Sequence, residues 1–146
     1  MAKTGYFVLY WSWFEMALGE AISDARARLD EEARSVRGNL EERVNLWHAL
    51  VTRLPENKDR AALADDLRAQ ALALRRVRNV IIHGLAGGDA RSTLEGGAHI
   101  RCVVGGYEAP TGASEVFTMD DLQLFIDGAD ACRRGCADLR RFNFES

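Results

Sequence analysis

Hydrophobic residues recur at intervals of three and four positions along most of this chain, a pattern that predicts helices. The first such stretch covers residues 4–37 and ends before Gly38. Its apolar positions form a wide stripe that a helix would bury on one side; they are Phe7, Tyr10, Trp11, Phe14, Leu18, Ile22, Ala25 and Leu29. Arginine and acidic residues dominate from Arg26 onward, so we expect the second part of this helix to lie in solvent.

Two further helices are predicted before residue 84. One covers residues 40–54, with Asn39 placed to cap its first turn and Pro55 to end it. The next begins near Asn57 or Asp59 and ends at His83. The apolar positions are Leu40, Val44, Trp47, Val51 and Leu54 in the first of these helices, and Leu63, Leu67, Leu74, Val77 and Ile81 in the second, with Gln70 or Ala71 filling its gap.

The pattern changes after Gly84. Residues 84–97 are rich in glycine and small polar side chains and predict a loop. Two strand candidates follow, with turn signals between them, so we expect a small β-hairpin over about 98–118. Thr118 and Asp121 then resemble a capping box that opens a fourth helix. The apolar seam of that helix is Leu122, Phe125, Ala129, Cys132, Cys136 and Leu139.

These elements predict one mainly α domain over residues 1–146: a four-helix bundle of the up-and-down type with the hairpin inserted before the last helix. No apolar run approaches the roughly 18 residues that a membrane span needs, and no signal-peptide cleavage site follows the aromatic stretch at 7–14. Three cysteines without CxxC spacing favour a reducing compartment. We therefore expect a cytoplasmic protein with no membrane partner.

The charge is unevenly distributed. The chain carries a formal net charge of −3, yet residues 75–101 hold five arginines against Asp89 and Glu95. A basic patch on an acidic body suits binding at one phosphate site better than tracking along a duplex. The alternative is that arginines gather near a helix C-terminus because the helix dipole favours them there.

Three residues near the end of the third helix could carry chemistry. Asn79 and His83 are four positions apart and would share a helix face, and the long side chain of Arg78 can swing towards them. A histidine beside an arginine can deprotonate a ribose 2′-hydroxyl while the arginine stabilises charge on the phosphorus, with no metal or cofactor required. Arg75 and Arg76 are candidates for binding a flanking phosphate. In the structural alternative, His83 caps helix carbonyls and Arg78 forms a salt bridge with the first helix.

At these residues the chain resembles the HEPN superfamily. The motif of that family is an arginine, a short gap and a histidine, with a polar residue commonly right after the arginine. Here Arg78, Asn79 and His83 fill the three places, four residues separate the arginine from the histidine, and Gly84 follows. The long first helix with an aromatic start and the strand-bearing insert before the last helix are also similar to some members.

The resemblance implies a function. HEPN proteins typically dimerise so that two motif helices form one shared cleft, and many are metal-independent endoribonucleases that leave a 2′,3′-cyclic phosphate. The resemblance implies that Arg78 and His83 act in catalysis and that Asn79 assists them. It also implies that the substrate is single-stranded RNA or tRNA. The biological role would be that of a toxin or of a phage-defence protein, in some cases with an antitoxin protein as partner. The alternative is a non-catalytic dimeric HEPN-like module that binds a nucleotide or a protein partner.

Other polar residues are weaker candidates. Glu15 lies within or beside the apolar stripe of the first helix and needs a partner, for which Arg78 or Arg75 is the obvious choice, so it is a candidate orienting carboxylate. His48 is expected to be an edge or satisfied core histidine, and His99 to be exposed. Cys132 and Cys136 are expected to be small core residues, because no further metal ligands lie near them.

Overall fold

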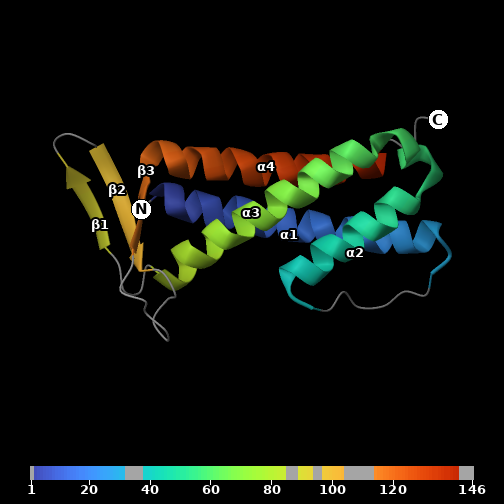
Figure 1. Ribbon diagram of the computed structural model, residues 1–146, viewed down its shortest axis with the longest axis horizontal. Coiled ribbons are helices and arrows are strands. Elements are labelled where there is room, and N and C mark those ends of the chain that lie inside the picture. The colour runs from blue at the N-terminus through green and yellow to red at the C-terminus, as the bar shows by residue number, and fades with distance from the viewer. Residues whose placement is uncertain (1, 32–37, 85–88, 94–96, 104–113, 142–146) are drawn as a thin grey trace.

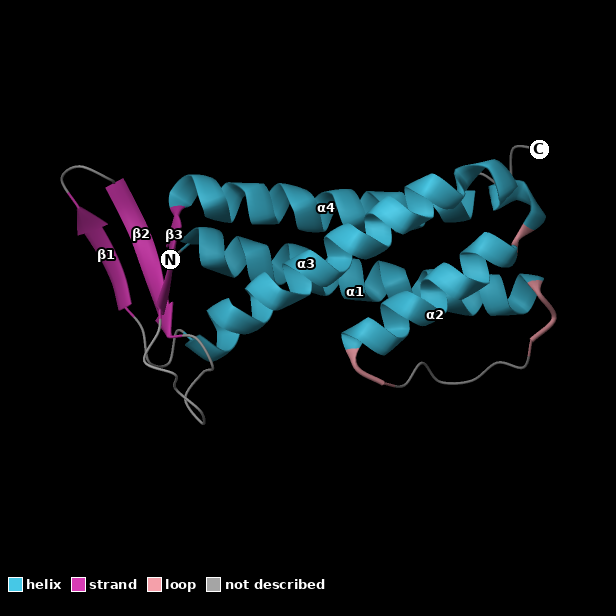
Figure 2. Cartoon of the chain, viewed as in Figure 1, coloured by secondary structure: helices cyan, strands magenta, loops and turns pink. Residues whose placement is uncertain are grey.

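The computed structural model describes residues 2–31, 38–84, 89–93, 97–103 and 114–141, except for some side chains within these ranges, that of His83 among them. Its four helices are α1 (Ala2–Arg28), α2 (Leu40–Arg53), α3 (Ala61–Gly84) and α4 (Met119–Arg141), and the short 3-10 helix η1 (Pro55–Arg60) joins α2 to α3 (Figure 1). A small sheet lies at the end of the bundle where α4 begins (Figure 2). The predicted mainly α bundle with a strand insert before the last helix is confirmed. The predicted up-and-down order is not observed, because α1, α2 and α4 run in one direction and α3 in the other (Figure 1).

The sheet contains the predicted hairpin and one strand that was not predicted. β2 (Gly97–Val103) pairs antiparallel with β3 (Ser114–Thr118), with Ile100 opposite Phe117. β1 (Asp89–Thr93) pairs antiparallel with β2, so the loop predicted over residues 84–97 was wrong for residues 89–93. The β1 sequence has little β-propensity of its own, and pairing with β2 decides its conformation. The turn signals between the two strand candidates, the glycine pair at 105–106 and the Pro-Thr-Gly segment at 110–112, lie outside the described residues.

Helix α1 is shorter than predicted. It ends at Arg28 rather than at residue 37, because Asp30 adopts a left-handed conformation with φ 54°. The N–H groups of Asp30 and Glu31 donate to the carbonyls of Ala27 and Arg26, at 3.3 and 2.8 Å. This is the Schellman arrangement, which satisfies the last carbonyls of a helix and turns the chain away from its axis. Here an aspartate takes the position that glycine usually occupies.

The core is built on one side of α1. Phe7, Trp11, Phe14, Leu18 and Ile22 are buried there, and aromatic side chains form its first layers, with ring centroids of neighbouring pairs 5–6 Å apart. The predicted seams of α2 and α4 are buried or partly buried as expected.

The seam of α3 differs from the prediction at its start. Ala64 is buried and Leu63 is 38% exposed, because the buried positions step from Ala64 to Leu67, Ala71 and Leu74. Ala71, rather than Gln70, fills the predicted gap.

Two glycines let α3 and α4 approach closely. A Cβ atom on Gly135 would lie 2.5 Å from Leu67 Cδ1, and one on Gly128 would lie 3.1 Å from Leu74 Cδ1. Each leucine therefore occupies space that a larger residue on α4 would fill. Because the two contacts run in opposite directions along the two helices, α3 and α4 pack antiparallel.

The predicted helix caps are confirmed. Asn39 Oδ1 accepts a hydrogen bond of 2.9 Å from the Glu42 N–H at the start of α2. At the start of α4, the Asp121 N–H donates to Thr118 Oγ1 at 3.1 Å, and the Thr118 N–H donates to Asp121 Oδ2 at 2.9 Å. This reciprocal pair is a capping box with aspartate in place of glutamate.

Removing this cap should weaken the fold. We expect Thr118→Ala to lower the free energy of unfolding by about 1 kcal/mol, because it leaves the Asp121 N–H without its acceptor. Urea denaturation followed by circular dichroism measures the change. Ser23→Ala, at an exposed position on α1, is the matched control and should change the free energy by less than about 0.5 kcal/mol. Equal losses in the two variants would contradict the role of the cap.

The core cysteines should be chemically inert. Burial raises the pKa of the Cys132 and Cys136 thiols to about 12, so both stay protonated at pH 8 and present no thiolate. We expect a maleimide or disulfide reagent to label them at pH 8 only after unfolding. The raised pKa values also predict that stability falls as the pH rises above 9, the ordinary value that these thiols regain on unfolding. Mass spectrometry of native and urea-treated protein locates the labelled residues, and fast native labelling would contradict their burial.

Candidate functional site

A cavity of about 190 Å³ opens where α1, the start of α2 and the second half of α3 meet. Its lining includes four residues predicted for the site, Glu15, Arg75, Arg78 and Asn79, and is completed by Trp11, Asn39 and Leu40. Since a water molecule takes about 30 Å³ in the liquid, the space suits a group the size of a phosphate better than a whole nucleotide.

Arg78 is the residue of the cavity lining that has a buried side-chain nitrogen without a hydrogen-bond partner among the described residues. Its Nη1 donates to Asn79 Oδ1 at 3.2 Å. Its Nε is buried and has no hydrogen-bond acceptor among the described residues. No ion pair joins Arg78 to any acidic side chain that the structure describes, so the salt bridge to the first helix considered above is not seen within those residues. A buried guanidinium N–H without an acceptor is costly, and an anion in the cavity would relieve that cost.

Glu15 has partners other than the expected ones. Trp11 Nε1 donates to Glu15 Oε1 at 2.8 Å, and Arg43 of α2 lies 3.9 Å from the other carboxylate oxygen. The prediction that Glu15 needs a partner is confirmed, but the partner comes from α2 and α1 rather than from Arg75 or Arg78. Glu15 faces the start of α2, because it lines the cavity together with Asn39 and Leu40.

The two candidate phosphate-binding arginines are placed differently. Arg75 lines the cavity and lies 3.6 Å from Glu41 at the first turn of α2. Arg76 is not among the residues that line the cavity; it donates to Glu115 of β3 at 2.5 Å and is 66% exposed. Arg75 thus remains a candidate for contact with a ligand in the cavity, whereas Arg76 ties α3 to the sheet.

The histidine of the motif is placed only by its backbone. His83 lies in the last turn of α3, four residues after Asn79. Its side chain lies outside the described part of the structure, as do the side chains of Arg91, His99 and Arg101.

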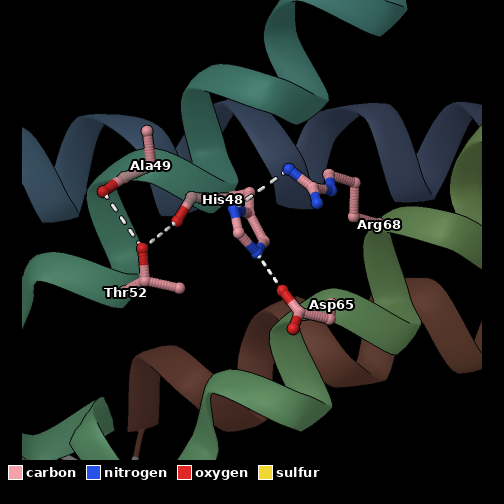
Figure 3. Close-up of polar contacts among 5 residues, drawn as sticks. All are labelled: His48, Ala49, Thr52, Asp65 and Arg68. Atoms are coloured by element: carbon pink, nitrogen blue, oxygen red, sulfur yellow. Dashed lines mark hydrogen bonds and ion pairs between the residues drawn. The ribbon is translucent and has the colours of Figure 1, made fainter.

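His48 forms a separate polar cluster between α2 and α3 (Figure 3). Its Nε2 lies 2.5 Å from Asp65 Oδ1, and Arg68 Nη1 donates to its Nδ1 at 3.3 Å. Since Nδ1 accepts this bond, the proton of a neutral ring sits on Nε2 and points at Asp65. Both nitrogens are occupied, which confirms the expectation of a satisfied edge histidine.

Within the described residues, no group of three or more histidine, cysteine or acidic side chains could hold a metal ion. None of the helices in that part of the chain combines the length and apolarity that crossing a bilayer demands. Comparisons with protein-family models, curated proteins and solved structures gave no match.

The unpaired Arg78 leads to a test of stability. We expect Arg78→Met to leave the free energy of unfolding within about 0.5 kcal/mol of wild type or to raise it, because an apolar side chain of similar length removes a buried donor that lacks an acceptor. Arg68→Met is the matched control. It should cost about 1 kcal/mol, because it removes the donor to His48 Nδ1. Urea denaturation measures both, and a loss above about 2 kcal/mol for Arg78→Met would show that Arg78 is a structural residue.

Proposed function

We propose that the chain is a metal-independent endoribonuclease of HEPN type that acts as a homodimer on single-stranded RNA or tRNA in the cytoplasm. The observation that carries the proposal is the cavity in which the buried Arg78 Nε lacks an acceptor among the described residues while its Nη1 donates to Asn79. An RNA phosphate is an anion of the right size and geometry for such a guanidinium. A toxin or phage-defence role, with an antitoxin as a further partner, belongs to the same proposal.

The other charges of the cavity support a selective anion site. Glu41 lies near Arg75, and Arg43 lies near Glu15. The charges of Arg75 and Glu15, which line the cavity, are therefore already partly neutralised. Arg78 is thereby left as the cation best able to attract a phosphate. Asn79, held by Arg78, can present its amide N–H₂ to the same group because its Oδ1 is the atom that accepts from Arg78.

The proposed reaction uses the substrate's own nucleophile. His83 removes the proton from a ribose 2′-hydroxyl, and the 2′-oxygen attacks the adjacent phosphorus while Arg78 stabilises the added negative charge. The bond from phosphorus to the 5′-oxygen breaks, and that oxygen takes up the proton that His83 removed, so the histidine acts first as base and then as acid. The products are a 2′,3′-cyclic phosphate and a 5′-hydroxyl end.

Cleavage of labelled RNA in EDTA tests the proposal. We expect the purified chain to cut single-stranded RNA or tRNA and leave 2′,3′-cyclic phosphate ends. Arg78→Ala and His83→Ala should each lower the rate at least about a hundredfold, because each removes a group that acts in the transition state. Gel electrophoresis measures the rate, and mass spectrometry identifies the ends.

Two variants serve as matched controls. Arg134→Ala removes an arginine of α4 that is 64% exposed and lies outside the cavity lining. His48→Gln removes a histidine whose ring nitrogens are both engaged elsewhere. Both should cleave at the wild-type rate. If the wild-type chain cuts no RNA but binds a nucleotide in an Arg78-dependent way, the non-catalytic alternative replaces the proposal.

A further inference from the structure

The N-terminal half of α1 is apolar on its outer side as well as on its buried side. No charged residue occurs between Lys3 and Glu15. Of the nine large hydrophobic residues that are exposed in the described part of the chain, five lie on this helix: Tyr6 at 57%, Val8 at 37%, Leu9 at 42%, Trp13 at 41% and Met16 at 64%. A helix that is hydrophobic all round is normally covered on all sides.

Two glycines on the same helix have no role in the packing of the part of the chain that the structure describes. A Cβ atom on Gly5 or on Gly19 would meet nothing within 4 Å, although glycine within a helix is less favourable than alanine. The glycines of α4 differ, because the side chains of Leu74 and Leu67 pack against Gly128 and Gly135. The two glycines are seven residues apart, and so are the two leucines. Close helix packing accounts for the glycines of α4 and leaves those of α1 unexplained.

Helix α1 contains both components of the packing between α3 and α4, which are small residues that leave space and large residues that fill it. Gly5, Ser12 and Gly19 are small residues spaced seven apart, and Leu9 and Met16 are large residues spaced seven apart beside them. An antiparallel copy of the same helix would place Leu9 against Ser12 and Met16 against Gly5, and the reverse pairs follow by symmetry. This self-complementarity is what a two-fold interface requires.

We propose that the outer face of α1, made by Gly5, Leu9, Ser12 and Met16 with Tyr6, Val8 and Trp13 on its flanks, binds α1 of a second copy of this chain in antiparallel orientation. An aromatic side chain offers about 150–250 Å², so Tyr6 and Trp13 alone expose roughly 200 Å². With their neighbours they approach the 500 Å² or so that each partner contributes to a small specific interface.

The interface adjoins the candidate site. Glu15 lines the site cavity and also the open groove along the outer face of α1, together with Met16 and Gly19. The antiparallel register brings Val8 of the second copy, which lies on the same flank of the helix as Glu15, beside that residue, so each copy would complete the cavity rim of the other. This last step rests on the proposed function; the interface itself does not.

Light scattering coupled to size-exclusion chromatography tests the interface on the full chain at tens of micromolar. We expect a dimer for the wild type and a monomer for Met16→Glu and for Gly5→Leu. Both substituted positions are open in the single chain, so the helical circular dichroism spectrum should not change. Leu124→Glu is the matched control: Leu124 is 67% exposed on α4, and its variant should stay dimeric.

The other outcomes distinguish failure of the proposed interface from failure of the proposed function. A monomeric wild type would overturn it, including one that co-sediments with anionic phospholipid vesicles, which would assign the face to a lipid surface. A wild-type dimer that survives both Met16→Glu and Gly5→Leu would place the interface elsewhere. A dimer that these variants disrupt but that cuts no RNA would uphold the interface while the proposed function fails. Full cleavage by the monomeric variants would remove the link between interface and site.

Discussion

Burial of one side of α1 is the constraint on which the rest of the structure depends. Phe7, Trp11, Phe14, Leu18 and Ile22 lie almost entirely out of water, and each such side chain contributes about 1.5–3 kcal/mol by being buried. α4 packs along this stripe from one side and α2 from the other (Figure 1). α3 then packs on α2 and α4, and the cavity lies where its second half passes the start of α2.

This geometry determines which polar groups find partners. Residues at the mouth of the cavity come from three helices, so acidic and basic side chains from different helices can pair: Glu15 with Arg43, and Arg75 with Glu41. Arg78 lies one turn beyond Arg75 on α3, where the described residues offer it the Asn79 amide but no carboxylate. A neutral acceptor compensates only part of the desolvation of a guanidinium. The cavity therefore favours an anion beside Arg78, because this is the arginine for which the described residues offer no carboxylate.

The sequence was sufficient for the features that depend on periodicity and capping. The apolar seams of α1, α2 and α4, Asn39 at the start of α2 and the capping box at Thr118 all follow from local rules, and the structure confirms them. The errors arose where tertiary contacts decide. The end of α1 rests on a left-handed Asp30, which carries no glycine signal, and β1 exists because β2 pairs with it. The Arg43 partner of Glu15 could not be predicted, because the rotation of α2 against α1 follows from packing of the whole bundle.

The glycines of α1 and α4 present the same local sequence signal with different outcomes. On α4, Gly128 and Gly135 are filled by leucines of α3, so their cost in helix propensity is offset inside the chain. On α1, Gly5 and Gly19 are equally unfavourable for the helix, but no side chain of the described residues packs against them. The outer side of this helix is also apolar. Two unfavourable features on one face need a common cause, and close contact with another helix removes both, since it buries the apolar side chains and uses the space above the glycines. A second α1 is the helix that carries the matching residues at the matching spacing.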